Sequence, residues 1–252
     1  MEPLTVLPAD LGPGVLAGFT TRAGGVSTGD HAGLDLALHV GDDPRAVAGN
    51  RERLAAWAGG RVRFARQVHG TAVATVADRG PDGAGADSEH EADALVTAEP
   101  GVPIGVLVAD CLPVLLADPE ARVAGAAHAG RRGLLAGVLP RVVEAMTAAG
   151  ARPERLRAVV GPAAGGCCYE VPAAMQEEAV AAMPHLRATT TWGTPSLDLR
   201  AGAVAQLRGL GLGAVTTAGG CTIEDESFFS YRRAGTTGRF AGVVVLAPRP
   251  AR

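Results

Sequence analysis

Short apolar segments alternate along the chain with longer segments whose apolar residues recur every three or four positions. Short runs bounded by Pro, Asp or Gly are typical of buried strands, whereas the longer period indicates amphipathic helices. The pattern predicts strands over residues 14–21, 63–67, 71–76, 92–97, 103–109, 122–128, 156–160, 214–218 and 240–246. It predicts helices over residues 44–57, 131–149, 172–183 and 197–210.

The order of these elements indicates the fold class. Some strands are separated by helices, while Pro113 to His128 reads as a hairpin, which requires antiparallel neighbours. This mixture favours an α/β (α+β) fold with mixed rather than purely parallel sheets. No Ser/Gly-rich or Pro-rich linker divides the 252 residues, so we expect a single domain over 1–252.

Two segments carry local signals. In the helix predicted over 131–149, Gly150 supplies the C-terminal cap and Pro140 either kinks the helix or divides it. The segment 79–91 is rich in Gly and acidic residues, which predicts a solvated loop with His90 as an exposed bystander.

Three residues able to bind a metal, His69, Cys111 and His128, fall at or just beyond the ends of predicted strands. A sheet holds such residues rigidly while they face a loop-lined cavity. Two imidazoles and one thiolate suit zinc, and three protein ligands leave a fourth position for water or substrate. A buried Cys or a lone His also occurs as ordinary core packing, so both interpretations stand on ligand chemistry alone.

The peptides around these residues resemble the YfiH family, whose members are known as polyphenol oxidases (laccase domain), purine nucleoside phosphorylases and peptidoglycan editing factors. The matching peptides cover residues 21–27, 39–43, 50–51, 67–70, 92–97, 109–114, 128–131, 161–162, 169–171, 198–199 and 229–233. The resemblance implies zinc bound by His69, Cys111 and His128, and two stacked mixed sheets with helices outside, a four-layer α/β/β/α arrangement. One departure is Asp35, where the family usually has Asn, so any donor role of an Asn amide is absent here.

Further site candidates lie in the same peptides. The helix predicted to begin after His128 would point its first N–H groups toward the metal, and Arg131 adds a positive charge there. This arrangement suits phosphate. Arg132 is the weaker candidate, because adjacent side chains on a helix diverge. The other candidates are Asp110 and Glu170 for proton transfer, and Arg22, Ser27, Gln67, Tyr169 and Arg232 for substrate binding. Asp110 fits second-sphere support of a ligand His equally well. Cys167 and Cys168 fit inert packing as well as a role in the site.

Charge and composition narrow the partners. The net charge of −3 gives no general attraction to nucleic acid or anionic membranes, and no apolar run approaches the length of a membrane span. All 23 basic residues are Arg, so any anion clamp uses guanidinium groups. We expect a cytoplasmic protein with reduced thiols, a monomer or weak homodimer, acting on a small molecule.

Chemistry separates the functions that the resemblance offers. A multicopper laccase needs an imidazole-rich cluster, which six His of scattered spacing do not provide, so we expect zinc rather than copper. The leading hypothesis, implied by the resemblance, is a zinc-dependent purine nucleoside phosphorylase acting on adenosine, inosine or methylthioadenosine, with adenosine deaminase activity. The alternatives are a cysteine- or metal-dependent hydrolase that edits peptidoglycan precursors, a polyphenol oxidase, and a non-enzymatic metal-binding protein.

Overall fold

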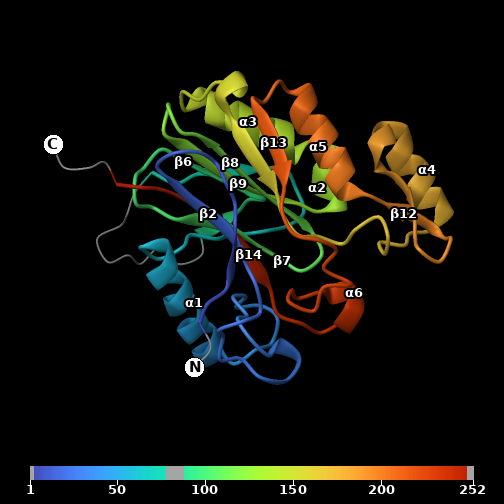
Figure 1. Cartoon of the computed structure of the whole chain (residues 1–252), viewed down its shortest axis with the longest axis horizontal. Helices are drawn as coiled ribbons and strands as arrows, with labels where there is room; N and C mark the ends of the chain where they lie inside the picture. Colours follow the sequence, from blue (N-terminus) through green and yellow to red (C-terminus); the bar gives the residue numbers. More distant parts are fainter. Residues whose placement is uncertain (1–2, 78–87, 249–252) are drawn as a thin grey trace.

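Two large β-sheets form the centre of the structure, a computed structural model that describes residues 3–77 and 88–248 (Figure 1). The four-stranded sheet has the order β1-β2-β14-β7, and the six-stranded sheet the order β13-β10-β8-β9-β6-β4. The strands of the first are β1 (Val6–Pro8), β2 (Val15–Thr20), β14 (Phe240–Leu246) and β7 (Ile104–Val108). Those of the second are β13 (Ala214–Thr217), β10 (Arg157–Val160), β8 (Leu112–Asp118), β9 (Val123–Ala129), β6 (Ala94–Thr97) and β4 (Val73–Thr75).

The two sheets differ in strand direction. The six-stranded sheet is mixed, because β10 pairs in parallel with β13 and β4 with β6, while its other pairs are antiparallel. Every pair in the four-stranded sheet is antiparallel. The α/β architecture with stacked sheets is confirmed, but only the six-stranded sheet is mixed, whereas both were expected to be. The hairpin expected between Pro113 and His128 is the β8–β9 pair.

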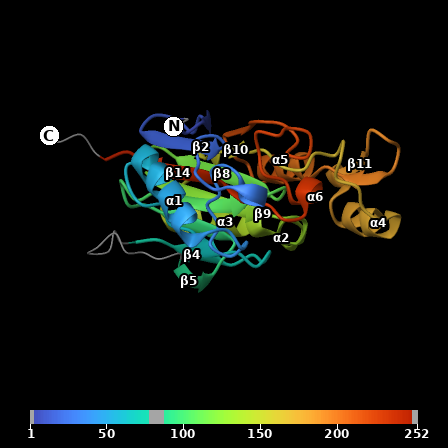
Figure 2. The same cartoon turned by 90° about the horizontal axis from the view of Figure 1, so that it is seen from below.

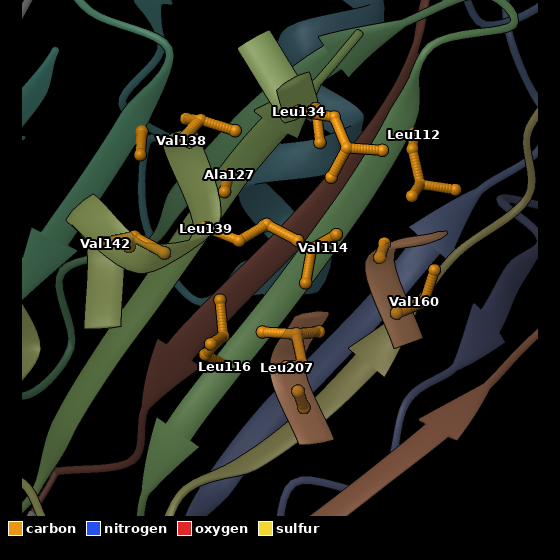
Figure 3. Close-up of a cluster of buried hydrophobic side chains, with 14 of the residues drawn as sticks. Leu112, Val114, Leu116, Ala127, Leu134, Val138, Leu139, Val142, Val160 and Leu207 are labelled. Carbon is orange, nitrogen blue, oxygen red and sulfur yellow. The ribbon is translucent and has the colours of Figure 1, made fainter. Parts of the chain in front are cut away.

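Alternation along the strands builds the core on both faces of the six-stranded sheet. In β8, Leu115 and Ala117 pack toward the four-stranded sheet, in a cluster with Phe19 and Val244. The intervening residues of β8 pack with the helices on the opposite face, because successive side chains in a strand point to opposite sides. Figure 3 shows this second cluster, which includes Leu112, Val114, Leu116, Leu134, Leu139, Val142, Val160 and Leu207.

Helices cover the outer face of each sheet. The apolar residues of α2 (Arg131–Ala136), α3 (Val138–Ala148) and α5 (Leu199–Gly209) pack on the six-stranded sheet. Leu54 and Ala58 of α1 (Pro44–Ala58) pack on β7 and β14 of the other sheet. The layers are therefore α/β/β/α, as expected. Helix α4 (Ala173–Ala182) lies at one end of the molecule beside the small sheet of β11 (Arg187–Thr189) and β12 (Pro195–Leu197) (Figures 1 and 2).

Two local predictions need correction. The helix expected over 131–149 is divided, but at Gly137, whose φ of 94° ends α2; Pro140 lies in the first turn of α3, where proline is tolerated. The loop expected over 79–91 is wrong at its end, because Ser88–Glu91 form strand β5, which pairs in parallel with β3 (Ala65–Arg66). The remainder of that prediction, residues 79–87, lies outside the described residues.

Each other predicted strand and helix overlaps an observed one. The sequence pattern did not predict β1, β11, β12 or the short helix α6 (Tyr231–Ala234). Among the described residues, no helix has both the length and the apolar character required to cross a membrane.

Candidate metal centre and cavity

The three expected ligands come together from two strands and one loop. Cys111 immediately precedes β8, and His128 lies in β9, opposite Pro113. His69 lies in the loop between β3 and β4. The antiparallel register of the hairpin therefore brings Cys111 and His128 to the same end of two central strands, and the loop supplies the third side chain.

The geometry of this group fits a metal ion. One ligand atom from each residue lies within 4.8 Å of the others, and Cys111 Sγ is 3.6 Å from His69 Nε2. The two imidazole rings meet edge to face at 78°, with centroids 4.7 Å apart. His128 is buried, Cys111 is partly buried and His69 is exposed, so the group is open on one side. Two imidazoles and a thiolate are a tetrahedral donor set with one vacant direction.

Gly130 allows the ligands to approach each other. A Cβ atom at this position would lie 2.7 Å from Cδ2 of His69 and 3.1 Å from Sγ of Cys111. The first distance is too short for two carbon atoms. The residue after β9 must therefore be glycine for His69 and Cys111 to keep their places.

A buried carboxylate, Asp93, supports two of the ligands. Its Oδ1 lies 2.7 Å from His128 Nδ1 and accepts the backbone N–H of His69 at 2.9 Å, while Oδ2 accepts the N–H of Gly70 at 2.6 Å. Burial alone would raise the pKa of Asp93, but the hydrogen bonds from His128 and Gly70 outweigh it and the pKa is lowered. Asp93 therefore remains ionised, fixes the His128 ring and holds the loop that carries His69.

The thiol of Cys111 and the imidazole of His128 shift each other's pKa in opposite directions. Burial opposes ionisation of Cys111, but hydrogen bonds with His128 and His69 lower its pKa to about 6. Burial likewise opposes protonation of His128, but the hydrogen bonds to Asp93 and Cys111 raise its pKa to about 9. At neutral pH, the metal-free group therefore contains a thiolate, the form in which sulfur binds metals.

Two of the three described non-glycine residues with a positive φ lie at the site. His69 and Asp110 have φ values of 61° and 84°, in the left-handed region that L side chains rarely adopt. Asp110 is held there by Thr222, whose hydroxyl donates to Oδ1 at 2.6 Å, and by the backbone N–H of Arg232, which donates to Oδ2 at 2.7 Å. Such strain persists only where surrounding contacts enforce it, and it clusters at functional sites.

The metal group forms part of the wall of a cavity of about 810 Å³. This volume is in the range of small-molecule sites. The lining residues are Leu38, His39, Ala65, Arg66, Gln67, His69, Leu107, Val108, Ala109, Asp110, Cys111, His128, Arg131, Tyr169, Leu199, Tyr231, Arg232 and Arg239. The cavity thus combines metal ligands, guanidinium groups and apolar surface.

Most of the site residues expected from the sequence meet at this cavity. Besides the three ligands, its lining contains Gln67, Asp110, Arg131, Tyr169 and Arg232. The guanidinium of Arg232 lies over the Tyr169 ring, 4.8 Å from its centroid. The Gln67 amide donates to Leu107 O at 2.7 Å and accepts Leu107 N–H at 2.8 Å, so its polar atoms tie the loop to β7.

The remaining three candidates lie elsewhere in the described chain. Arg22 donates to Ala32 O and lies over the Phe229 ring, and Ser27 donates to Asp42. Both bind neighbouring loops, and neither is part of the lining. Glu170 is exposed, and its Oε2 accepts from Trp192 Nε1 at 2.8 Å, also outside the lining.

Two residues of the site were not singled out from the sequence. Asp93 lies within a matching peptide, but nothing in the sequence shows that its carboxylate reaches His128, 35 positions away. Arg239 precedes β14 and enters the cavity from the four-stranded sheet. In the sequence, Arg239 is marked only by its position at the start of a predicted strand, and many surface arginines share that position.

Comparison with known proteins shows the family of the chain. Residues 16–247 match the family described as multi-copper polyphenol oxidoreductase laccase. A Streptomyces griseus protein named as a purine nucleoside phosphorylase is 52% identical over 233 residues, which are 90% of this chain and 93% of that protein.

Two solved structures are similar over nearly their whole length. The Neisseria meningitidis protein NMB0706 superposes with a TM-score of 0.85 at 35% identity, covering 97% of this chain and 99% of that one. The Bacillus licheniformis hypothetical protein YfiH has a TM-score of 0.82 at 32% identity, with 92% of each chain covered.

Proposed function

The chain belongs to the multi-copper polyphenol oxidoreductase laccase family, and within it we propose a purine nucleoside phosphorylase that uses zinc and also deaminates adenosine. The observation that carries this proposal is that one cavity is lined both by His69, Cys111 and His128 and by Arg131, Arg232 and Arg239. A relative 52% identical to the chain bears the phosphorylase name.

The guanidinium groups supply the phosphate site. Phosphate is a tetrahedral oxyanion, and arginine can bind two of its oxygen atoms through paired N–H donors; the chain has no lysine to do so. Arg131 follows the His128 strand directly and lies on the cavity wall beside the metal group. We assign Arg131 to phosphate; Arg66, Arg232 and Arg239 also line the same cavity.

The apolar part of the lining suits the base and sugar of a nucleoside. Leu38, Leu107 and Val108 offer aliphatic surface, and Tyr169 offers a ring that Arg232 already covers from one side. An aromatic ring of this kind is a stacking surface for a purine. Substrate is thereby held with its reacting atoms between the metal group and the arginines.

His69, Cys111 and His128 would hold the zinc ion. When bound, it supplies a Lewis acid that polarises a substrate oxygen or activates water, which serves both bond cleavage and deamination. Asp93 keeps a proton on His128 Nδ1, so that Nε2 is the atom offered to the cavity. A His₂Cys set also occurs in copper proteins, so metal analysis is part of the test.

Asp110 is the proton-transfer group that we favour over Glu170. Asp110 lines the cavity next to Cys111, whereas the Glu170 carboxylate binds Trp192 outside it. Asp110→Asn should lower turnover sharply, while Glu170→Gln should retain it. The reverse result would transfer the role to Glu170.

The direct test incubates the zinc-loaded protein with adenosine, with and without phosphate, and separates adenine, inosine and hypoxanthine. Adenine that forms only with phosphate supports phosphorolysis, and inosine that forms without phosphate supports deamination. Both products should be lost in His69→Ala and His128→Ala. Wild-type rates in both variants would refute a metal-dependent site.

A matched pair of variants tests the phosphate assignment. Arg131→Ala should lower kcat/KM for phosphate by about tenfold to a hundredfold, the usual value of a charge-assisted hydrogen bond. Arg132→Ala removes the same charge from the next residue, which is exposed and outside the lining, and should have little effect. If wild type makes no purine product but cleaves a peptidoglycan precursor, the hydrolase alternative replaces this proposal.

A further inference from the structure

A second group of metal-binding side chains lies outside the cavity. The ligand atoms of Cys167, Cys168, Cys221 and Glu224 are all within 4.8 Å of one another. Cys168 Sγ lies 3.1 Å from Cys167 Sγ, and Cys167 donates to Glu224 Oε2 at 3.2 Å. All three thiols are free, and the proposed phosphorylase chemistry uses none of them.

Adjacent parallel strands bring the two halves of this group together. Cys167 and Cys168 follow β10, and Cys221 and Glu224 follow β13, its parallel partner. Segments that leave the carboxyl ends of neighbouring parallel strands remain side by side, and here they form a parallel bridge between Ala163 and Cys221. The cluster is therefore a product of the sheet topology rather than of a chance surface contact.

The scaffold around the sulfur atoms is fixed by protein contacts alone. Gly165 donates its backbone N–H to Cys221 Sγ at 3.2 Å, which fixes the position of this sulfur. A Cβ at Gly165 would lie 3.1 Å from Cys167 Sγ and 3.2 Å from Cys221 Cβ, so glycine permits the close approach. The Arg200 guanidinium donates to the carbonyl groups of Gly161, Gly219 and Gly220, which joins both segments.

We propose that Cys167, Cys168, Cys221 and Glu224 bind a second zinc ion, in a closed site with a structural role. Three sulfur ligands and one carboxylate complete four-fold coordination, which distinguishes structural from catalytic zinc sites. Zinc–sulfur bonds of about 2.3 Å place two sulfur atoms about 3.8 Å apart in a tetrahedron. The ligand atoms of the group all lie within 4.8 Å of one another, so small shifts of the side chains reach that separation.

The position of this site indicates what the ion stabilises. Cys168 precedes Tyr169, whose ring lines the cavity under Arg232. Cys221 precedes Thr222, whose hydroxyl donates to Asp110. An ion bound by both segments therefore fixes Tyr169 and Asp110, two residues of the cavity lining, without touching substrate.

Zinc content of purified, reduced protein tests the proposal. Wild type should contain two equivalents, Cys111→Ala one, and Cys221→Ser one, with almost none in the double variant. Glu224→Gln should weaken the second ion, whereas Glu226→Gln, which removes the same charge two residues away, should leave two equivalents. Two equivalents in Cys221→Ser, or none in Cys111→Ala, would overturn the second site.

Cobalt substitution keeps the test independent of folding defects and of enzyme activity. In Cys111→Ala, cobalt should give the intense near-ultraviolet and visible bands of a tetrahedral site with several thiolates. Glu224→Gln, which retains all three sulfur atoms, should shift those bands while circular dichroism stays as in wild type. The protein could be isolated with a disulfide between Cys221 and Cys167 or Cys168. If such protein still shows no cobalt band after the disulfide is reduced, the site is refuted. The cobalt spectrum does not depend on phosphorylase activity, so the second metal site and the proposed function can each be refuted without the other.

Discussion

His128 Nδ1 lies 2.7 Å from Asp93 Oδ1, and both side chains are buried. The hydrogen bond decides which nitrogen of the ring carries the permanent proton, so Nε2 is left for the metal. Because the same carboxylate accepts the N–H of His69, one residue orients two of the three ligands. Asp93 is therefore a positioning residue for the two histidines of the candidate metal centre.

Asp93→Asn should lower zinc affinity by about tenfold to a hundredfold, as the loss of a carboxylate partner to a ligand histidine usually does. The amide keeps one oxygen for the loop N–H groups but removes the charge that holds the ring. Competition with a chromophoric chelator measures the change. The variant's melting temperature is the control, since a large drop would indicate a folding defect; wild-type affinity would contradict the positioning role.

Zinc binding should release a proton between pH 6 and pH 9. In this range the metal-free protein holds Cys111 as thiolate, with a pKa of about 6, and His128 as imidazolium, with a pKa of about 9. The ion displaces one proton from His128, so affinity should rise about tenfold per pH unit and level off above pH 9. Calorimetry in two buffers of different ionisation enthalpy counts the proton. Release of none in this range would contradict the prediction.

Gly130→Ala should reduce zinc binding, because the new Cβ would lie 2.7 Å from His69 Cδ2 and force the ligands apart. Gly209→Ala is a matched control in helix α5, where a Cβ meets nothing within 4 Å. That change should leave zinc content intact and stabilise the protein by up to about 1 kcal/mol. Equal zinc content in the two variants would show that the site tolerates the extra atom.

Asp35→Asn should stabilise the protein by about 1 kcal/mol at neutral pH. Asp35 is fully buried; Oδ1 accepts the N–H groups of Ala37 and Arg239, but Oδ2 has no partner within the described residues. Burial, together with Asp42, raises the pKa of Asp35. The wild type should therefore lose stability as pH rises from about 4 through this raised pKa, and the variant should not.

The buried carboxylate of Asp118 provides a control of opposite sign. It accepts N–H groups from Ala121 and Arg152 and pairs with Arg155, which outweigh burial and lower its pKa. Asp118→Asn should cost about 1–3 kcal/mol, and the wild type should lose this contribution only as pH falls below about 4. Urea unfolding across pH measures both variants. The same sign for the two substitutions would contradict the electrostatic argument.

The architecture was predictable because its elements follow strong local patterns. The run 240–246 is apolar throughout and forms β14 with the predicted bounds. Elements with weak patterns were missed, as with β5, whose sequence Ser-Glu-His-Glu is fully polar and pairs only because β3 lies beside it. Local propensity also favoured Pro140 as the helix break, whereas the positive φ of Gly137 made the division one turn earlier.

The site was predictable where residue chemistry is distinctive, and less so where it depends on contacts. His69, Cys111 and His128 are recognisable as ligands by type, and they do meet. Arg22 and Ser27 share the family's peptides but bind loop partners, because a matching peptide does not reveal where a side chain points. Asp93 required the register of β6 against β9, which pairs Ala94 with Ala127.

The placement of two ligands at one end of the β8–β9 hairpin determines how the ion exchanges. These strands lie in the middle of the six-stranded sheet, so their amides should open to hydrogen exchange only with global unfolding. His69 instead lies exposed on a loop that Asp93 secures. Ion release should therefore begin with His69, at a rate set by that loop, and chelators should strip the metal from a protein that stays folded.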